Sequence, residues 1–87
     1  MSTIEKLIQR VLSVPSDLSY DELKNFLSYY NFIEDTKGKT SGSRVRFMRQ
    51  HDSALILLHK PHPSNIVGRK TIRAVIENLK ERGDLNE

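Results

Sequence analysis

Residues Thr36–Phe47 read TKGKTSGSRVRF, a Gly-rich basic turn that runs into a strand. Successive side chains of a strand leave on opposite faces, so Val45 and Phe47 are expected to face a core. Arg44 and Arg46 then share the outer face, with their guanidinium groups about 7 Å apart along the strand. One face of this strand is therefore structural, and the other can bind anions.

The turn ahead of the strand has a composition that suits phosphate binding. Lys37 and Lys39 bracket a glycine, and Gly42 and Ser43 are small residues with exposed backbone N–H groups. The rest of the chain has to support the strand and complete this surface.

The flanking sequence predicts three helices and two further strands. Apolar residues at helical spacing indicate a helix over Ile4–Leu12, with Ser2 and Glu5 as a capping box and Pro15 as its boundary. Ser19 and Glu22 form a second capping box. In chain order, the predicted elements are helices 2–12 and 19–30, a short strand that begins at Phe32 and Ile33, strands 43–47 and 54–58, and a helix from about Gly68 to Arg82.

Details of these elements are also predicted. Asn31 is expected in the left-handed conformation, and Gly83 is expected to end the last helix. Residues 49–53 read as a polar hairpin connection. The uninterrupted apolar run Ala54–Leu58 predicts a strand that is covered on both faces or lies at the centre of a small sheet. Tyr20 and Tyr29 fall off the inner stripe of their helix, which favours exposed positions.

Charge is distributed unevenly along the 87 residues. The chain carries 14 basic and 11 acidic residues, a net charge of +3, but residues 36–73 hold nine basic residues against the single acid Asp52. The remaining residues hold five basic and ten acidic ones. This asymmetry predicts a protein that binds a polyanion with one face. The nine are Lys37, Lys39, Arg44, Arg46, Arg49, Lys60, Arg69, Lys70 and Arg73.

Composition excludes several classes of protein. The chain has no cysteine, so it has no disulfide framework, thiolate nucleophile or Cys-ligated zinc site. It shows no signal peptide and no apolar run of about 20 residues. We expect a single cytoplasmic domain, residues 1–87, that acts without metal, small-molecule cofactor or membrane.

The order and spacing of several short motifs resemble the HicA toxins. These motifs are Gly42-Ser43 at the start of the second strand, a His-containing loop after the third, and Thr71-Ile72-Arg73 near the start of the last helix. The resemblance covers about residues 19–83 and leaves residues 1–15 as an additional N-terminal helix. It implies an α+β fold similar to the double-stranded-RNA-binding domain, with a three-stranded antiparallel sheet packed against helices. Together with the additional N-terminal helix, the predicted order of elements is ααβββα.

The same resemblance implies a function and partners. HicA toxins are messenger-RNA interferases of bacterial toxin–antitoxin pairs, so it implies RNA as substrate and a cognate HicB-like antitoxin as inhibitor. RNA would then be held by Lys37, Lys39, Gly42, Ser43, Arg44, Arg46, Lys60, Arg69, Lys70 and Arg73.

This chain departs from the HicA pattern at the residue that matters most for catalysis. The family usually has its catalytic histidine after Gly-Ser, where this chain has Arg44. A guanidinium keeps its proton, so Arg44 can bind phosphate and stabilise charge but cannot act as a general base. Either the catalytic imidazole has moved to His62 or His59, or the chain binds RNA without cutting it.

His62 is the preferred catalytic candidate, because Pro61 and Pro63 stiffen the backbone on either side of it. The alternative for both histidines is an exposed loop position without chemistry. His51, in the preceding turn, is interpreted as a surface residue. A His-x-x-His metal site is disfavoured, since Asp52 is the only nearby acid.

Three classes of function therefore remain open. The first is an endoribonuclease toxin, and the second is a non-catalytic nucleic-acid-binding module of the same fold. The third is a protein-interaction domain whose basic face meets an acidic partner.

Overall fold

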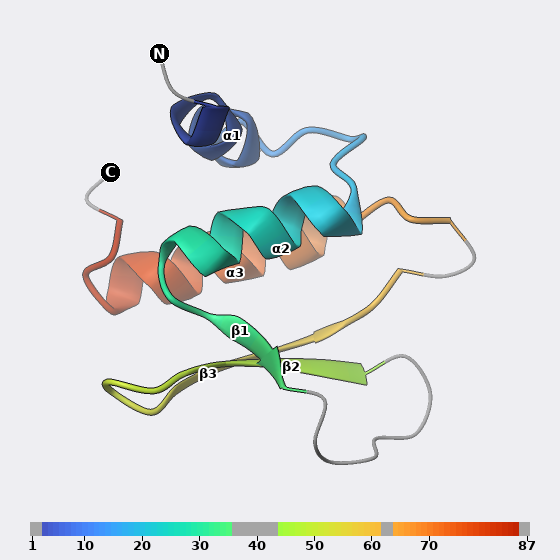
Figure 1. Cartoon of the computed structure of the whole chain (residues 1–87). Helices are drawn as coiled ribbons and strands as arrows, with labels where there is room; N and C mark the ends of the chain where they lie inside the picture. Colours follow the sequence, from blue (N-terminus) through green and yellow to red (C-terminus); the bar gives the residue numbers. More distant parts are fainter. Residues whose placement is uncertain (1–2, 36–43, 62–63, 86–87) are drawn as a thin grey trace.

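The computed structural model describes residues 3–35, 44–61 and 64–85. Its elements are α1 (Thr3–Leu12), α2 (Tyr20–Tyr29), β1 (Ile33–Asp35), β2 (Arg44–Arg49), β3 (Ala54–His59) and α3 (Arg69–Glu81). The strands form an antiparallel sheet in the order β1-β2-β3. Helices α2 and α3 lie side by side over one face of it, and α1 lies beyond them (Figure 1). The predicted α+β fold, with order ααβββα, is confirmed.

The capping box predicted at the start of α2 is present. The Ser19 hydroxyl accepts a hydrogen bond from the Glu22 N–H at 3.1 Å, and Glu22 Oε1 accepts one from the Ser19 N–H at 2.9 Å. Leu18 and Leu23, which occupy the two positions of a hydrophobic staple, are both fully buried. At the other end of the helix, Asn31 has a φ of 72°, as predicted. Local sequence therefore sets both ends of α2.

Helix α3 ends in a Schellman motif. Gly83 has a φ of 85°, which a residue with a Cβ rarely adopts. Its N–H donates to the Lys80 carbonyl at 3.0 Å, and the Asp84 N–H donates to the Leu79 carbonyl at 2.9 Å. The predicted glycine stop is confirmed.

An apolar core lies between the sheet and helices α2 and α3. The apolar stripes of both helices point into it, and β2 and β3 contribute their inner faces. Its members include Leu23, Phe26, Leu27, Phe32, Phe47, Ile56, Leu58, Ile72, Val75, Ile76 and Leu79. This core fixes the sheet, so the residues on its opposite face have fixed neighbours.

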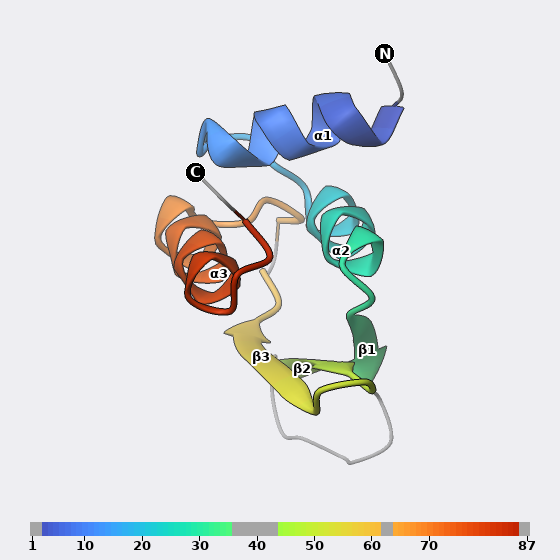
Figure 2. The ribbon, with the colours of Figure 1, turned by 90° about the vertical axis from the view of Figure 1, so that its left-hand side faces the viewer.

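Helix α1 covers the helical layer from outside, where it crosses above α2 and α3 (Figure 2). Val11 is fully buried, and Leu7, Ile8 and Leu12 are half-buried against the core. Arg10 ties the helix to α2 through Glu22, with Nε 2.9 Å from Oε2, and it also pairs with Asp17 at 3.1 Å. These ion pairs are partly exposed. The predicted cap at Ser2 lies outside the described residues.

The prediction for residues 54–58 was wrong in one respect. They form a strand, but no described strand lies beyond β3, so β2 is the central strand and β3 an edge. Burial alternates along β3: Ile56 and Leu58 face the core, while Leu55 and Leu57 are 43% and 72% exposed on the outer face. The run is uninterrupted because leucines also occupy the face of β3 that is open to solvent.

From the sequence, Arg49 was expected in the polar hairpin connection, and the structure shows that this was wrong. Arg49 is the last residue of β2, and it is only 3% exposed. Its Nε and Nη2 donate to Asp52 at 3.0 and 2.7 Å, its Nη1 donates to the Tyr30 carbonyl at 3.2 Å, and its guanidinium lies 4.6 Å from the Phe32 ring centre. Nη1 also pairs with an Asp84 carboxylate oxygen at 3.0 Å. We call this group the Arg49 cluster.

Candidate nucleic-acid interface

The outer face of β2 and β3 brings Arg44 and His59 together. These two residues are direct cross-strand partners, and Arg46 is the partner of Leu57. All four side chains leave the sheet on the face that the helices do not cover. A groove of about 410 Å³ opens here, lined by Arg44, Val45, Arg46, Leu57, Leu58 and His59. Two guanidinium groups and one imidazole thus surround an apolar floor.

Arg46 is engaged in an ion pair. Its Nε and Nη2 donate to the same oxygen of Asp35 at 3.1 and 2.5 Å. Asp35 lies across β2 on β1, as the cross-strand partner of Arg46. A phosphate that binds Arg46 must therefore compete with this carboxylate. Arg44 is exposed at the start of β2. Arg44 is the arginine that lies directly across from His59 in the sheet.

Lys60 follows His59 and lies over an aromatic ring of α2. Its Nζ is 5.3 Å from the centre of the Tyr20 ring. Tyr20 is 3% exposed, so the expectation of an exposed Tyr20 was wrong, whereas Tyr29 is exposed. Burial, followed by the negative charge of Glu34, raises the pKa of the Tyr20 hydroxyl. The hydroxyl makes no hydrogen bond of normal geometry with a described residue.

The start of α3 lies at the same end of the molecule as the groove. In Figure 1, β3 ends on the right-hand side of the view, and β2, α2 and α3 begin there. The segment that leads into α3 is bound to the start of α2, because Tyr20 N–H donates to the Asn65 carbonyl at 2.8 Å and Val67 N–H donates to the Leu18 carbonyl at 2.7 Å. The position of the α3 start is therefore fixed by backbone hydrogen bonds.

Exposed basic residues occupy the first turn of α3 without acidic compensation. Arg69 and Lys70 are exposed, no acid lies in this turn, and the N-cap Gly68 supplies no side-chain hydrogen bond. Neither residue pairs with an acid in the described part of the chain. Cations at a helix N-terminus oppose the helix dipole, and a bound anion would remove this conflict. We name Arg44, His59, Lys60, Arg69 and Lys70 the cationic end.

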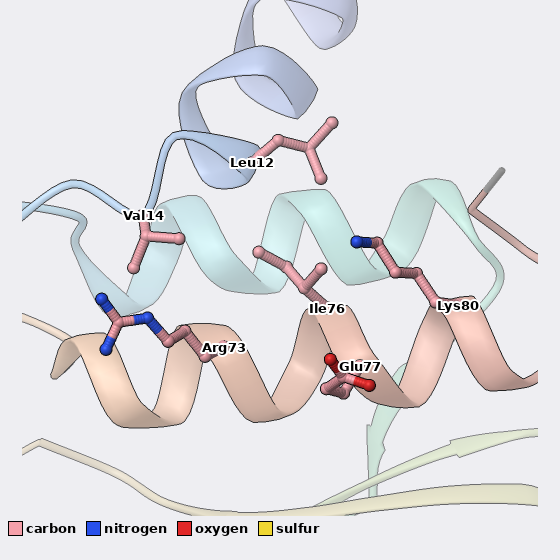
Figure 3. A pocket seen from close by; sticks show the side chains of 6 residues that line it. All are labelled: Leu12, Val14, Arg73, Ile76, Glu77 and Lys80. Atoms are coloured by element: carbon pink, nitrogen blue, oxygen red, sulfur yellow. The ribbon is translucent and has the colours of Figure 1, made fainter. Parts of the chain in front are cut away.

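Arg73 faces a different part of the surface. It lines a second cavity, of about 360 Å³, between α3 and the end of α1 (Figure 3). Leu12 and Val14 provide the apolar wall of this cavity, and Glu77 and Lys80 lie along α3 beside Arg73. Arg73 is therefore grouped with charges of both signs, apart from the groove between β2 and β3.

The structure reduces the number of cations available for RNA. Arg49 is neutralised inside the Arg49 cluster, and Arg46 is paired with Asp35. The predicted site residues Lys37, Lys39, Gly42, Ser43 and His62 lie outside the described residues. Within the described ranges, no cluster of three His, Cys, Asp or Glu side chains could hold a metal ion.

The sequence contained a signal for the pairing of Arg44 with His59 that the prediction did not use. A connection of four residues between Arg49 and Ala54 sets the register of the hairpin, and counting back along both strands aligns residue 44 with residue 59. The prediction began the connection at Arg49 instead, so it assigned no register. His51 is exposed in the hairpin turn, as expected.

No family model, no curated protein and no solved structure matches this chain. Among the described helices, none is long and apolar enough to cross a membrane. The resemblance to HicA toxins therefore rests on the short motifs and on the order of the elements.

Proposed function

We propose that this protein binds RNA at its cationic end and cleaves the bound strand there, as a ribonuclease toxin that a cognate HicB-like antitoxin inhibits. One observation carries the proposal: Arg44 and His59 are cross-strand partners on the open face of the sheet, in a groove. Directly opposed residues of an antiparallel pair have their Cβ atoms about 4.5–5.5 Å apart. A phosphodiester bound to Arg44 would then lie within reach of the imidazole.

The chemistry requires a base and a charge stabiliser, and no metal. An imidazole of the site takes the proton of the ribose 2′-hydroxyl, and the 2′-oxygen attacks the adjacent phosphorus. The bond from phosphorus to the 5′-oxygen breaks, and that oxygen gains a proton. The products are a 2′,3′-cyclic phosphate and a 5′-hydroxyl. Arg44 stabilises the charge that develops on the phosphate oxygens.

Two histidines are candidates for the base. His59 is placed by the sheet register beside Arg44. His62, the candidate preferred from sequence, lies outside the described residues, and its neighbouring prolines remain the argument for it. The proposal requires that one of these two imidazoles acts as the base.

The remaining cations extend the site along the RNA backbone. Lys60 directly follows His59, and Arg69 and Lys70 begin α3 at the same end of the molecule. Phosphate contacts of this kind position a nucleic acid without reading its sequence. An antitoxin that blocks RNA must therefore cover the cationic end, and acidic residues suit that role.

A non-catalytic RNA-binding module is the second candidate function, and one observation favours it. The described part of the groove contains a single imidazole, whereas this cleavage needs both a base and an acid that protonates the leaving oxygen. Arg44 cannot act as the base. If no second proton donor joins His59, the groove binds RNA and leaves it intact.

The test is a cleavage assay with a labelled single-stranded RNA and purified full-length variants. We expect the unmodified chain to cut the RNA and leave a 2′,3′-cyclic phosphate. Either His59→Ala or His62→Ala should lower the rate by about 10²-fold or more, because general base catalysis contributes on this scale. RNA affinity should change little in that variant.

The matched control is His51→Ala, an exposed histidine in the hairpin turn at the other end of β3. It should cleave like the unmodified chain. RNA that is bound but not cut would favour the non-catalytic module, and absence of RNA affinity would contradict both candidates.

A further inference from the structure

The exposed edge of β3 is the least protected part of the described sheet. β1, at the opposite edge, has three residues, and short edge strands offer little to pair with. β3 has six residues, ALILLH, with no proline and no Lys, Arg, Asp or Glu. Edge strands of sheets are usually protected by proline or charged side chains, by bulges or by a covering segment. No described segment of this chain covers β3.

Hydrogen bonding shows which backbone groups of β3 are open. Arg82 Nη2 donates to the Leu55 carbonyl at 3.2 Å from the α3 side, so this carbonyl points away from β2. Backbone direction alternates in an antiparallel strand, and therefore Leu57 and His59 also direct their N–H and C=O groups outward. No hydrogen bond from a described residue reaches the outward groups of these two residues.

The open segment has a boundary at each end. Arg82 already occupies the Leu55 carbonyl, and it is held in place because its Nε donates to Asn78 at 2.5 Å. Two residues after His59, Pro61 has no N–H to donate. Only Leu57 and His59 can therefore exchange complete pairs of hydrogen bonds with a new strand.

We propose that β3 pairs antiparallel with β3 of a second copy of this chain, around a two-fold axis at Leu58. In this register Leu57 of one copy exchanges two hydrogen bonds with His59 of the other, and symmetry repeats the exchange, for about four bonds in total. Leu55 then lies opposite Pro61 of the partner. Pro61 has no N–H to donate to the Leu55 carbonyl, and Arg82 already donates to that carbonyl. The boundary at Leu55 in one copy therefore fits the boundary at Pro61 in the other.

The charge of this edge favours a second copy over another partner. A two-fold interface places each surface against itself, so it requires a surface with few charges. The chain is cationic overall, yet the side of α3 next to β3 presents Thr71, Ala74 and Asn78, which line a cleft with Ile56, Leu57 and Leu58. Figure 2 shows α3 above β3 on the same side of the molecule, opposite α2 and β1. The residues that line this cleft carry no charge, so this part of the surface can face its own copy without repulsion, and Arg82 lies at its end, where it binds the Leu55 carbonyl.

Side chains of the outer face would add apolar contact. Leu57, which is 72% exposed, would lie beside His59 of the partner, and the two three-stranded sheets would join into one of six strands. The paired segment is short, so we expect reversible association that depends on concentration. The pairing does not depend on the proposed RNA chemistry.

The test measures the mass of the full-length chain in solution by sedimentation, between about 1 μM and 1 mM, the range of Kd expected for a small interface. The average mass should rise from that of a monomer toward twice that value. Leu57→Lys should keep the chain monomeric, because it adds a charge to each side of the axis. Ile33→Lys is the matched control, because Ile33 is 56% exposed on the same face of the sheet but lies on β1. The Ile33→Lys variant should still form the dimer.

Amide hydrogen exchange of the unmodified chain gives an independent readout. The Leu57 and His59 amides should exchange slowly at high concentration and rapidly on dilution, whereas the Ile33 amide should be insensitive to concentration. A chain that stays monomeric throughout the range would overturn the proposal. So would a dimer that Leu57→Lys and Ile33→Lys weaken equally, or one in which the Leu57 and His59 amides gain no protection.

Discussion

Arg44 and Arg49 show how position within one strand decides what a guanidinium does. They lie five residues apart in β2, so they leave the sheet on opposite faces. Arg44 faces outward into the groove, while Arg49 faces inward and connects the hairpin turn, the end of α2 and the C-terminal segment. The sequence showed the alternation through Phe47. Extending it by two residues would have placed Arg49 on the inner face.

The Arg49 cluster should make stability depend on pH in the acidic range. Hydrogen bonds from Arg49 lower the pKa of Asp52 from 3.8 to about 2. A carboxyl group whose pKa is lower in the folded state stabilises that state above its unfolded pKa, and the effect is lost as the pH falls through the folded pKa. This stabilisation should therefore be complete above about pH 4 and disappear toward pH 2.

We expect Asp52→Asn to lower the free energy of unfolding at neutral pH, with a deficit that shrinks between pH 4 and pH 2. Urea unfolding at a series of pH values measures it. Glu81→Gln is a control, because Glu81 is exposed and forms no ion pair with a described residue. A deficit for Asp52→Asn that stays constant down to pH 2 would show that the pair with Arg49 is not its cause.

Among the elements, helix ends were predicted well and the position of strands in the sheet was not. The capping box at Ser19, the left-handed Asn31 and the Gly83 stop depend on local backbone geometry, which short motifs determine. The place of β3 depends on its neighbours in space. Both faces of β3 carry apolar residues. The sequence pattern therefore could not distinguish a central strand from an edge strand with exposed leucines.

The capping box of α2 should contribute measurably to stability. Ser19→Ala removes the hydroxyl that accepts from the Glu22 N–H, and we expect a loss of about 1 kcal/mol in the free energy of unfolding. Ser28→Ala is the matched control within the same helix. Its hydroxyl is exposed and donates to the Asn25 carbonyl, and alanine favours helix, so stability should stay equal or rise slightly. Equal losses in the two variants, measured by urea unfolding, would contradict a capping role.

For the whole molecule, sequence predicted the separation of charge but not its fine distribution. The basic residues 44–73 do supply a cationic end, yet folding neutralises Arg49 and Arg46 and directs Arg73 toward α1. Counting charges along the chain cannot detect such pairing, because the acids Asp35 and Asp84 come from elements outside the basic segment. The order of elements was predictable because each carries its own periodicity.

The central claim, that the cationic end binds an RNA backbone, predicts a specific dependence on salt. Each phosphate neutralised on single-stranded RNA contributes about −0.7 to the slope of log K against log salt concentration. Arg44, Lys60, Arg69 and Lys70 together predict a slope of about −3.

The most direct measurement is this slope, determined by fluorescence anisotropy with a labelled RNA for the unmodified chain, Arg44→Ala and Lys80→Ala. Lys80 is an exposed lysine on the last turn of α3, away from the cationic end. We expect Arg44→Ala to bind more weakly and to flatten the slope by about 0.7, and Lys80→Ala to match the unmodified chain. A slope near zero for the unmodified chain, or equal effects of the two substitutions, would contradict the account.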